Sequence, residues 1–521
     1  MLPVKTIELN GYDLNSDDLA SCDAPLTCSI TPEARRRCRE SRGLLLDLIQ
    51  QRRVLYGITT GFGDSVDTAV DTADTERLQE NLYRYHGIGT GPVFSAAETR
   101  AILLVRLNAL SRGASAVREE LLDRIALLLN ADCLPRIPEQ GSVGASGDLT
   151  PLSYLAAVIA GERDVVYQGT QMPSEQALAA LGVPALKLSA KEGLALMNGT
   201  SVMTALAGRA VAVLDSCLLL ATELSAAAAE LVGGDQSAFS AHVHAMKPHA
   251  GQAMAAAHIH EFLASGQAYS QEGRLLPEQE RFEGEPVTLP YRLQAPYSIR
   301  CAPHVLGPAR DMLQVCRQWI HTELNSSNDN PLFDTERQEV YFAGHFYGGQ
   351  IVLAADSLRN AVATVAELVD KQCLLLLDAR RSGLPSNLVS PDLRASGNHG
   401  LKALGITVSS LAAEIAHLSA PVAPHTRPTE SMNQDVVSMG TISARRLRES
   451  CDMLVRLLAM QCIVVAAGYD CRRGGKQAGD RFTRLYTAIR QYSGPLSQDR
   501  ALDLEAESLA AAVRTGSLLP G

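Results

Sequence analysis

Three long apolar segments limit what this chain can fold into more strongly than any other feature of its sequence. They run roughly from Glu192 to Val232, from Ile351 to Ala379 and from Ile442 to Ala467, and they are rich in Ala and Leu and poor in Pro. Each exceeds the usual globular helix of about a dozen residues. Long helices that are apolar on most faces are buried, either within a bundle or between subunits. The sequence therefore predicts a mainly all-α protein with a long central bundle of roughly parallel and antiparallel helices, in an oligomer.

The N-terminal part of the chain has a more mixed pattern. Thr6–Leu9 is typical of a short strand. Thr31 followed by a proline is typical of a helix start, since Thr caps the helix and Pro fits its first turn. We expect this helix to run through Arg53. We also expect two domains, a smaller mixed one over residues 1–190 and a long-helix core with C-terminal helices over residues 191–521.

Composition and charge exclude several classes of function. The net charge is −10 without a basic patch, which argues against a nucleic-acid partner. Eleven cysteines without a Cys-x-x-Cys pair argue against a zinc ribbon or a disulfide framework and fit a reducing cytosol. The N-terminus lacks a signal-peptide pattern, and apolar runs such as Cys217–Thr222 are too short to span a bilayer. We therefore expect a cytoplasmic enzyme that contacts no membrane, with the acidic stretch Leu275–Pro290 as an exposed connection.

The densest glycine-rich stretch covers residues 141–152, with the sequence GSVGASGDLTPL. It leads into a helix start and first suggests an anion-binding loop. It is not a P-loop, because no Lys-Ser/Thr pair follows Gly147, and it lacks the spacing and the flanking strand of a dinucleotide-binding fingerprint. The whole string resembles the corresponding loop of the histidine, phenylalanine and tyrosine ammonia-lyase family. A lone Ala-Ser-Gly carries no such information, because the tripeptide is common.

The resemblance implies that Ala145, Ser146 and Gly147 cyclise autocatalytically into 4-methylidene-imidazol-5-one (MIO), the cofactor of that family. The amide nitrogen of Gly147 attacks the carbonyl of Ala145, which requires the unhindered amide and the backbone freedom of glycine. Ser146 then loses its hydroxyl as water and becomes an electrophilic methylene. The resemblance also implies a fumarase/aspartase-like fold and a homotetramer whose sites combine residues from three subunits. A plain helix-entry loop is the alternative interpretation.

Two further segments resemble the same family. Residues 56–63, YGITTGFG, are similar to its catalytic loop, which implies that Tyr56 is the base that removes the substrate's β-proton. An unperturbed tyrosine pKa of about 10 is too high for this role, so we expect a nearby positive charge or dipole. Residues 192–200, EGLALMNGT, are similar to a segment whose asparagine, here Asn198, hydrogen-bonds the cofactor. Seen alone, Tyr56 could be a core tyrosine and Asn198 part of a turn.

The sequence QAPYSIR at residues 294–300 resembles the family's Gln-x-x-Tyr-x-x-Arg motif. The resemblance implies that Arg300 holds the substrate carboxylate with two parallel hydrogen bonds. Tyr297 is then expected near the cofactor and the amino group, with Gln294 in the same network. On its own, Arg300 could equally be a surface ion-pair partner. Phe346 matches the family's phenylalanine beside the cofactor, although its neighbours depart from the usual Gly-Asn-Phe-His.

A late polar cluster, ESMNQD at residues 430–435, extends the resemblance toward the C-terminus. Glu430 matches a glutamate of the phenylalanine branch, and Asn433 lies in the same cluster. We expect both to contact the substrate. Gln434 stands where histidine-specific members carry Glu and where phenylalanine and tyrosine members carry Gln, so it disfavours histidine as substrate.

Selectivity in this family is attributed to the segment NLYRYHG at residues 81–87, where Tyr85 and His86 are expected to face the aromatic ring. Phenylalanine-specific members place Phe-Leu there, histidine-specific members Ser-His, and tyrosine-specific members a His at one position. Polar tips buried against a bare phenyl ring stay unpaired, at a cost of about 1–3 kcal/mol. We therefore expect L-tyrosine as substrate and trans-p-coumarate as product, with L-3,4-dihydroxyphenylalanine and caffeate close behind. A polar pair unrelated to substrate is the alternative.

Several functions stay open on sequence alone. An aromatic amino acid 2,3-aminomutase uses the same cofactor and returns ammonia to the β-carbon. Histidine or phenylalanine ammonia-lyase and a non-catalytic helical scaffold are further alternatives, although a scaffold has no need of the Ala-Ser-Gly triplet. The pairs His242-x-His244 and His258-x-His260 have no carboxylate or cysteine cluster beside them, so we expect no metal site.

Overall fold

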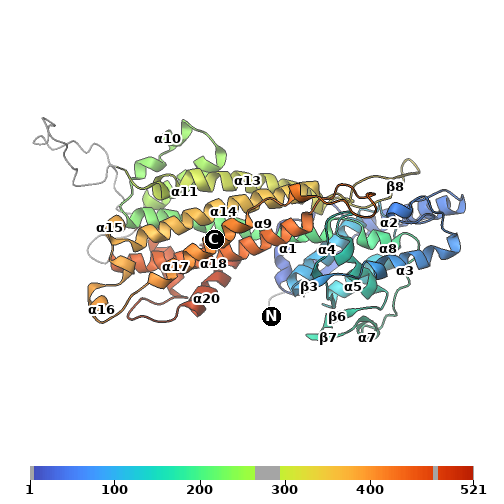
Figure 1. Cartoon of the computed structure of the whole chain (residues 1–521), viewed down its shortest axis with the longest axis horizontal. Coiled ribbons are helices and arrows are strands. Elements are labelled where there is room, and N and C mark those ends of the chain that lie inside the picture. The colour runs from blue at the N-terminus through green and yellow to red at the C-terminus, as the bar shows by residue number, and fades with distance from the viewer. Residues whose placement is uncertain (1–4, 265–293, 473–478, 520–521) are drawn as a thin grey trace, which may run out of the picture. The chain divides into compact units, whose positions relative to one another are not determined.

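The protein is described by a computed structural model that covers residues 5–264, 294–472 and 479–519 (Figure 1). The chain divides into two compact units. Unit 1 comprises Met1–Ala212, Cys316–Ser357 and Pro421–Arg448, and unit 2 comprises Val213–Val315, Leu358–Ala420 and Glu449–Gly521. Each unit is thus assembled from separate stretches of sequence, and the division expected at residue 190 remains a prediction. The stretch Leu275–Pro290 lies outside the described residues.

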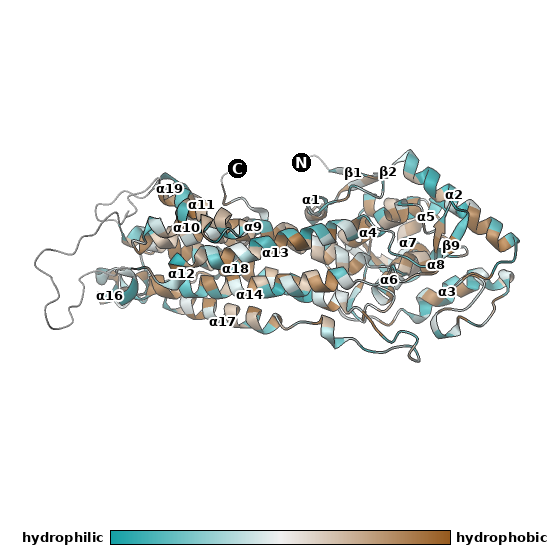
Figure 2. Ribbon diagram, turned by 90° about the horizontal axis from the view of Figure 1, so that it is seen from above, coloured by the Kyte–Doolittle hydropathy of each residue, from teal (hydrophilic) through white to brown (hydrophobic). Residues whose placement is uncertain are grey.

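Helices dominate the described chain, which confirms the predicted mainly all-α fold. The longest are α9, α13, α14 and α18, which cover Ser201–Leu231, Ala302–Leu324, Gly349–Leu377 and Gly440–Cys471. Hydrophobic and hydrophilic residues are interleaved along these helices (Figure 2). In unit 2, Gln372 of α14 donates a hydrogen bond to Ser225 of α9 at 2.9 Å and accepts one from Gln461 of α18 at 2.7 Å. These buried contacts hold three of the long helices side by side.

One predicted helix is in fact two. The segment Glu192–Val232 forms α8, Glu192–Met197, and then α9, with a break that begins at Asn198. Asn198 is extended, and Gly199 has a φ of +144°, which L side chains rarely adopt. A Cβ on Gly199 would lie 2.3 Å from the carbonyl oxygen of Asn328. The helical period of the flanking residues hides this break, which leaves Asn198 outside the helix at the site described below.

Unit 1 begins with the predicted strand and helix. The first elements are β1, Thr6–Leu9, its parallel partner β2, Thr27–Ile30, and α2, Pro32–Gln50. Thr31 caps α2 by accepting a hydrogen bond from the Ala34 amide at 3.2 Å. The helix ends before the predicted Arg53, because Arg52 takes a left-handed conformation with a φ of 59°.

The remaining elements of unit 1 frame the glycine-rich loop. Its other helices are α1 Ser16–Ala20, α3 Thr75–Tyr85, α4 Ala96–Ser111, α5 Glu119–Asn130, α6 Leu149–Ile159 and α7 Ser174–Ala180. Its short antiparallel strand pairs are β3 Thr90–Val93 with β5 Pro138–Gln140, β4 Leu134–Pro135 with β6 Asp164–Tyr167, β6 with β7 Thr170–Pro173, and β8 Leu332–Asp334 with β9 Glu339–Tyr341. Because β5 ends where the loop begins and α6 starts where it ends, both ends of the loop are anchored.

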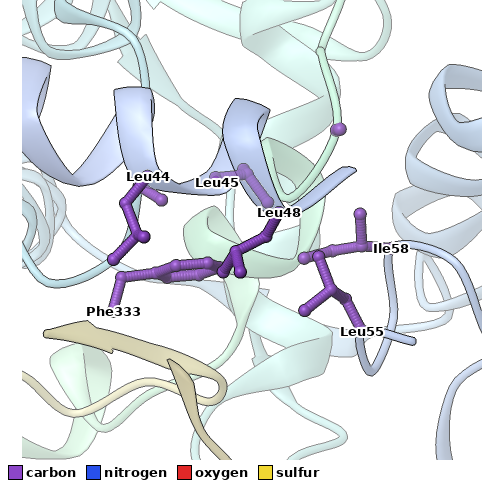
Figure 3. Close-up of a cluster of buried hydrophobic side chains, with 8 residues drawn as sticks. Leu44, Leu45, Leu48, Leu55, Ile58 and Phe333 are labelled. Carbon is purple, nitrogen blue, oxygen red and sulfur yellow. The ribbon is translucent and has the colours of Figure 1, made fainter. Parts of the chain in front are cut away.

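A hydrophobic cluster in unit 1 anchors the segment that carries Tyr56. The cluster contains Leu44, Leu45 and Leu48 of α2, Phe333 of β8, and the loop residues Leu55 and Ile58 (Figure 3). Leu55 and Ile58 flank Tyr56 in the sequence, and both are fully buried. Full burial of a leucine or isoleucine side chain contributes about 1.5–3 kcal/mol. The loop around Tyr56 is therefore fixed to α2 and β8 at its start.

Unit 2 is built from helices in its described part. The shorter ones are α10 Ala241–Ala245, α11 Ala250–Ala264, α12 Tyr297–Arg300, α15 Ala379–Ser382, α16 Pro391–Ala395, α17 Lys402–Leu418, α19 Asp480–Arg490 and α20 Asp503–Thr515. The long helices α9 and α18 each contain an 18-residue window, with mean hydropathies of 1.6 and 1.7, that is long and apolar enough to cross a membrane. Of these windows, 72% and 78% are buried inside the molecule, so both helices belong to its core.

Candidate functional site

A cavity of about 530 Å³ in unit 1 brings together residues from most of the segments that the sequence singled out. Its lining includes the predicted residues Tyr56, Tyr85, His86, Ala145, Ser146, Asn198, Phe346, Glu430, Asn433 and Gln434. Gly147 follows Ser146 in the same loop. Gln294, Tyr297 and Arg300 belong to unit 2, so their contribution to this site remains a prediction.

The cavity also has lining residues that sequence reasoning missed. Most are neighbours of predicted ones, namely Phe62, Gly63, Leu82, Leu149, Leu194, Asn330, Phe342, Asp435 and Val436. Leu82 lies one helical turn before His86, a spacing that places both on one face of α3. That spacing could have indicated that Leu82 reaches the cavity together with His86. Asn330 belongs to the segment Leu324–Leu332, which resembles a family segment close to the site and was expected to have a mainly structural role. No local pattern indicated that Phe342 reaches this cavity.

The segment Ala145–Gly147 is held by a short parallel bridge to the break between α8 and α9. The Gly199 amide donates to the Ser146 carbonyl oxygen at 3.1 Å, and the Asp148 amide donates to the Gly199 carbonyl oxygen at 2.7 Å. Gly147 has a φ of +75°, and a Cβ there would lie 2.1 Å from the Gly199 carbonyl oxygen. Both the left-handed backbone and the close approach therefore require glycine at position 147.

A second anchor fixes the other side of the same loop. The Met439 amide donates to the Val143 carbonyl oxygen at 2.9 Å, and the Ser438 amide donates to that of Gly144 at 3.2 Å. The two anchors bracket Ala145 and Ser146 and hold the loop in a tight turn. In the described part of the chain, the amide of Gly147 donates no hydrogen bond, so its nitrogen is available for another reaction.

Asp148 is a fully buried carboxylate that joins the loop to two helices. It accepts hydrogen bonds from the amides of Val202 at 2.8 Å and Met203 at 3.0 Å, in the first turn of α9. The Thr441 hydroxyl of α18 donates to its other oxygen. Burial raises the pKa of Asp148 to about 6, while these hydrogen bonds act to lower it. The sequence offered a signal for this role, because an acidic side chain suits the unpaired amides at the start of a helix. It did not indicate which helix Asp148 would bind.

Asn198 is oriented by a buried polar network. Its Nδ2 donates to Asp329 Oδ1 at 3.0 Å and to the Asn330 carbonyl oxygen at 3.1 Å, which leaves Oδ1 as its other polar atom. Asp329 in turn pairs with Lys191 at 2.6 Å, and both side chains are almost completely buried. Burial lowers the pKa of Lys191, and the charge of Asp329 opposes this shift. The sequence motifs did not indicate this link between Asp329 and Asn198.

Tyr56 is held at the cavity by contacts within its own loop. The Gly63 amide donates a hydrogen bond to Tyr56 Oη at 3.0 Å, and the Phe62 ring packs edge-on with a centroid distance of 6.5 Å. Burial raises the pKa of Tyr56, the Gly63 hydrogen bond lowers it, and the charge of Glu430 raises it further. The dipole expected beside this base is thus a single backbone amide, whose effect is smaller than that of burial.

Tyr85 and His86 lie at the end of α3 with their rings 4.4 Å apart. His86 Nδ1 contacts the Leu82 carbonyl oxygen at 2.9 Å. A carbonyl oxygen only accepts, so Nδ1 carries the proton and Nε2 of the neutral ring is an acceptor. Burial lowers the pKa of His86, which favours that neutral form. Tyr85 is 58% exposed on this chain.

The polar cluster at residues 429–434 forms a strained turn. Glu430, Ser431 and Met432 have φ values of 50°, 52° and 69°, all in the left-handed region. Thr429 and Gln434 close the turn with backbone hydrogen bonds of 3.0 and 3.3 Å and a side-chain bond of 2.7 Å. Such conformations persist only where the surroundings determine them, and they gather at functional sites.

The histidine pairs considered as metal ligands lie in unit 2 and have other partners. His244 is buried, with its ring nitrogens 3.0 Å from Gln252 Nε2 and 3.2 Å from the Ala238 carbonyl oxygen. His258 contacts Glu223 at 2.5 Å. Within residues 5–264, 294–472 and 479–519, no group of three or more His, Cys, Asp and Glu side chains could hold a metal ion.

Known proteins resemble this chain over nearly its whole length. The family model described as aromatic amino acid lyase matches residues 15–491. A histidine ammonia-lyase of Symbiobacterium thermophilum is 35% identical over 94% of this chain and 93% of its own length. A tyrosine ammonia-lyase of Cupriavidus metallidurans is 34% identical over 98% of this chain and 97% of its own length. Among solved structures, a tyrosine aminomutase from Streptomyces globisporus is similar with a TM-score of 0.91 and 32% identity, covering 98% of this chain and 97% of that one.

Proposed function

Since the chain belongs to the aromatic amino acid lyase family, we propose that it eliminates ammonia from L-tyrosine and forms trans-p-coumarate. The observation that carries the choice of substrate is the state of His86. Its Nδ1 is engaged by the Leu82 carbonyl oxygen, so its Nε2 offers a lone pair to a phenol hydroxyl in the cavity. A site that hydrogen-bonds a hydroxyl strongly rejects the analogue that lacks it.

The loop fits the autocatalytic cofactor in two respects. Position 147 has room only for glycine, and the Gly147 nitrogen makes no competing hydrogen bond in the described chain. We propose that Ala145, Ser146 and Gly147 form MIO through attack of this nitrogen on the Ala145 carbonyl carbon. When formed, the group supplies an electrophilic methylene that makes the substrate's amino group a better leaving group.

The chain's own residues supply the proton transfer. Tyr56 Oη accepts the β-proton, and the Gly63 amide, 3.0 Å away, stabilises the negative charge on Oη before that transfer. The electron pair of the broken C–H bond forms the new double bond as the amino group leaves the α-carbon. Asn198 orients the cofactor and Phe346 packs beside it, so both hold the reacting atoms in place.

The remaining assignments concern binding. Arg300 holds the substrate carboxylate, and Tyr297 and Gln294 contact the amino group and its surroundings. Glu430 and Asn433 face the same part of the substrate, and Asn433 Nδ2 contacts Glu430 Oε2 at 3.3 Å. In the family's arrangement Tyr56 and Tyr297 come from different chains, so we propose a homotetramer. We also propose a cytoplasmic location, supported by eleven cysteines that are all free.

The test is a spectrophotometric assay of the purified protein with L-tyrosine, L-phenylalanine, L-histidine and L-3,4-dihydroxyphenylalanine in parallel. We expect a conjugated arylacrylate to accumulate fastest from L-tyrosine. Faster product from phenylalanine or histidine would refute the choice of substrate and keep the elimination. No product from any substrate, together with a protein mass that shows no loss of water, would refute the lyase and favour a non-catalytic scaffold.

A second candidate is an aromatic amino acid 2,3-aminomutase, which the likeness to the tyrosine aminomutase structure favours. It uses the same residues and differs in retaining the ammonia until it adds to the β-carbon. Chromatography of the reaction mixture distinguishes the two. A β-amino acid that appears before the arylacrylate would indicate the mutase, and free ammonia in equal amount with the arylacrylate would indicate the lyase.

Histidine ammonia-lyase activity needs a separate argument, because a histidine ammonia-lyase is among the relatives that this chain resembles. Gln434 stands where histidine-specific members carry Glu, and its Oε1 already accepts a hydrogen bond from the Thr429 hydroxyl at 2.7 Å. The side chain therefore has no carboxylate to pair with an imidazolium. We expect turnover of L-histidine to be slow in the parallel assay.

A further inference from the structure

We propose that Glu430 is a positioning residue for Tyr56, because its carboxylate latches the Tyr56 loop and places a negative charge beside the base. This role is additional to the substrate contact proposed above and rests on Tyr56 being the base. Three observations carry it: a pair of neighbouring backbone amides, a close approach at Gly63, and the strained turn that presents Glu430.

The pair of amides belongs to the short helical turn Gly63–Ser65. The Gly63 amide donates to Tyr56 Oη at 3.0 Å, and the next amide, that of Asp64, donates to Glu430 Oε1 at 3.2 Å. Amides in the first turn of a helix have no partner within the helix and carry partial positive charge. The two neighbouring amides therefore each bind one oxygen atom, the phenol oxygen of Tyr56 and a carboxylate oxygen of Glu430.

The close approach is measured at Gly63. A Cβ built on this glycine would lie 1.8 Å from Glu430 Oε1 and 2.2 Å from its Cδ, so the carboxylate rests directly on the loop backbone. Gly63 also has a φ of +55°. A side chain at this position would expel Glu430 from its place, which makes the glycine part of the latch.

The turn at residues 429–434 keeps Glu430 in this place from the other side. Glu430 itself and the two following residues are left-handed, and the Thr429–Gln434 pairing closes the turn. Asn433 Nδ2 contacts the second carboxylate oxygen at 3.3 Å. A flexible glutamate could find other partners in water, whereas this backbone commits Glu430 to the Tyr56 loop.

The charge has a predictable effect on the base. The titratable groups that share the cavity with Tyr56 are Glu430 from the turn, Asp435 directly after it, and Tyr85 and His86 from the end of α3. A neighbouring negative charge disfavours the phenolate and so raises the pKa of Tyr56. Because the base works in its deprotonated form, activity rises with pH through this pKa. Removal of the charge should move that rise to lower pH.

Two substitutions separate the charge from the latch. Glu430→Gln keeps an oxygen that can accept from the Asp64 amide but carries no charge. Glu430→Asp keeps the charge but is one methylene too short to reach that amide. We expect the rising limb of kcat against pH to move down by about one pH unit in E430Q. In E430D we expect kcat to fall at least tenfold, while its rising limb stays at the same pH as in the wild type or moves to higher pH.

A role limited to binding the substrate's amino group predicts a different result. Both variants would then raise KM and leave the rising limb of kcat where it is in the wild-type enzyme. That outcome overturns the proposal. So does an equal fall of kcat in E430Q and E430D without any shift of the limb.

Amide hydrogen exchange over residues 56–70 tests the latch without any turnover. We expect faster exchange than wild type in E430D and near wild-type exchange in E430Q. Gly63→Ala should also speed exchange, because its Cβ displaces the carboxylate. The matched control is Gly169→Ala, at a φ of +74° with no heavy atom within 4 Å of the added Cβ, which tests left-handed strain alone.

The two readouts also separate this inference from the proposed function. If the wild-type protein turns over none of the aromatic amino acids, the proposed function is refuted. The exchange data still test whether Glu430 holds the Tyr56 loop. Unchanged exchange in both E430D and Gly63→Ala overturns the latch, whatever the substrate proves to be.

Discussion

At the scale of single residues, the proposed preference for L-tyrosine depends on one lone pair, that of His86 Nε2. We expect His86→Leu to lower kcat/KM for L-tyrosine at least tenfold and to raise it for L-phenylalanine, because the apolar side chain leaves a substrate hydroxyl unpaired. Steady-state kinetics with both amino acids measure this. Tyr85→Phe is the comparison variant, since it keeps the ring whose centroid lies 4.4 Å from that of His86 and removes only a hydroxyl. Equal losses for both substrates in His86→Leu would contradict the prediction.

A second residue-scale prediction concerns the buried pair of Lys191 and Asp329. Asp329→Asn leaves the ammonium of Lys191 buried and unpaired, which costs about 3–5 kcal/mol of unfolding free energy. Asp334→Asn breaks an exposed ion pair with Arg337, and solvent screening should leave the stability close to that of the wild type. Thermal or denaturant unfolding of both variants provides the comparison. Similar stabilities would show that the buried ion pair is not a structural requirement.

At the scale of elements, the break between α8 and α9 holds the Ala145–Gly147 segment in its turn. Gly199→Ala should prevent cyclisation, because its Cβ would lie 2.3 Å from the Asn328 carbonyl oxygen and 2.4 Å from an Arg106 nitrogen. Intact-mass spectrometry reads this directly, since a processed chain is two water molecules lighter than its sequence. Gly182→Ala, also left-handed but with open space around its Cβ, should process normally. Full processing of Gly199→Ala would disprove the requirement.

The same elements show what could be predicted from sequence. Helices α14 and α18 were foreseen because an apolar period is a local property. Helix α14 begins two residues before the predicted segment Ile351–Ala379 and ends two residues short of its end, and α18 extends beyond Ile442–Ala467 at both ends. A turn at Asn198 was only the alternative interpretation of its Asn-Gly pair, because the residues on both sides keep the helical period. Contacts such as Asn198 with Asp329 depend on segments far apart in the chain. No local pattern reports them, so the motif assigned residues to the site without indicating what orients them.

At the scale of the whole molecule, the proposed assembly can be tested by combining two inactive variants in one oligomer. If Tyr56 and Tyr297 meet at sites shared between chains, Tyr56→Phe and Tyr297→Phe should each be nearly inactive alone. Co-expression of the two variants should restore activity at those sites that draw both tyrosines from intact chains. Light scattering after size exclusion should show a tetramer throughout. A stable wild-type monomer, or a co-expressed pair without activity, would refute shared sites.

The anchors of the Ala145–Gly147 segment also determine when the enzyme can mature. Val143 and Gly144 are held by Met439 and Ser438, and Asp148 is held by Thr441, which follows it by 293 positions. A ribosome has to synthesise most of the polypeptide before these partners exist. The nascent chain therefore carries an ordinary, unreactive tripeptide while it is being made. If Ala145, Ser146 and Gly147 cyclise as proposed, the electrophile arises only once α18 has folded back onto the loop, which protects a growing chain from its own reactive group.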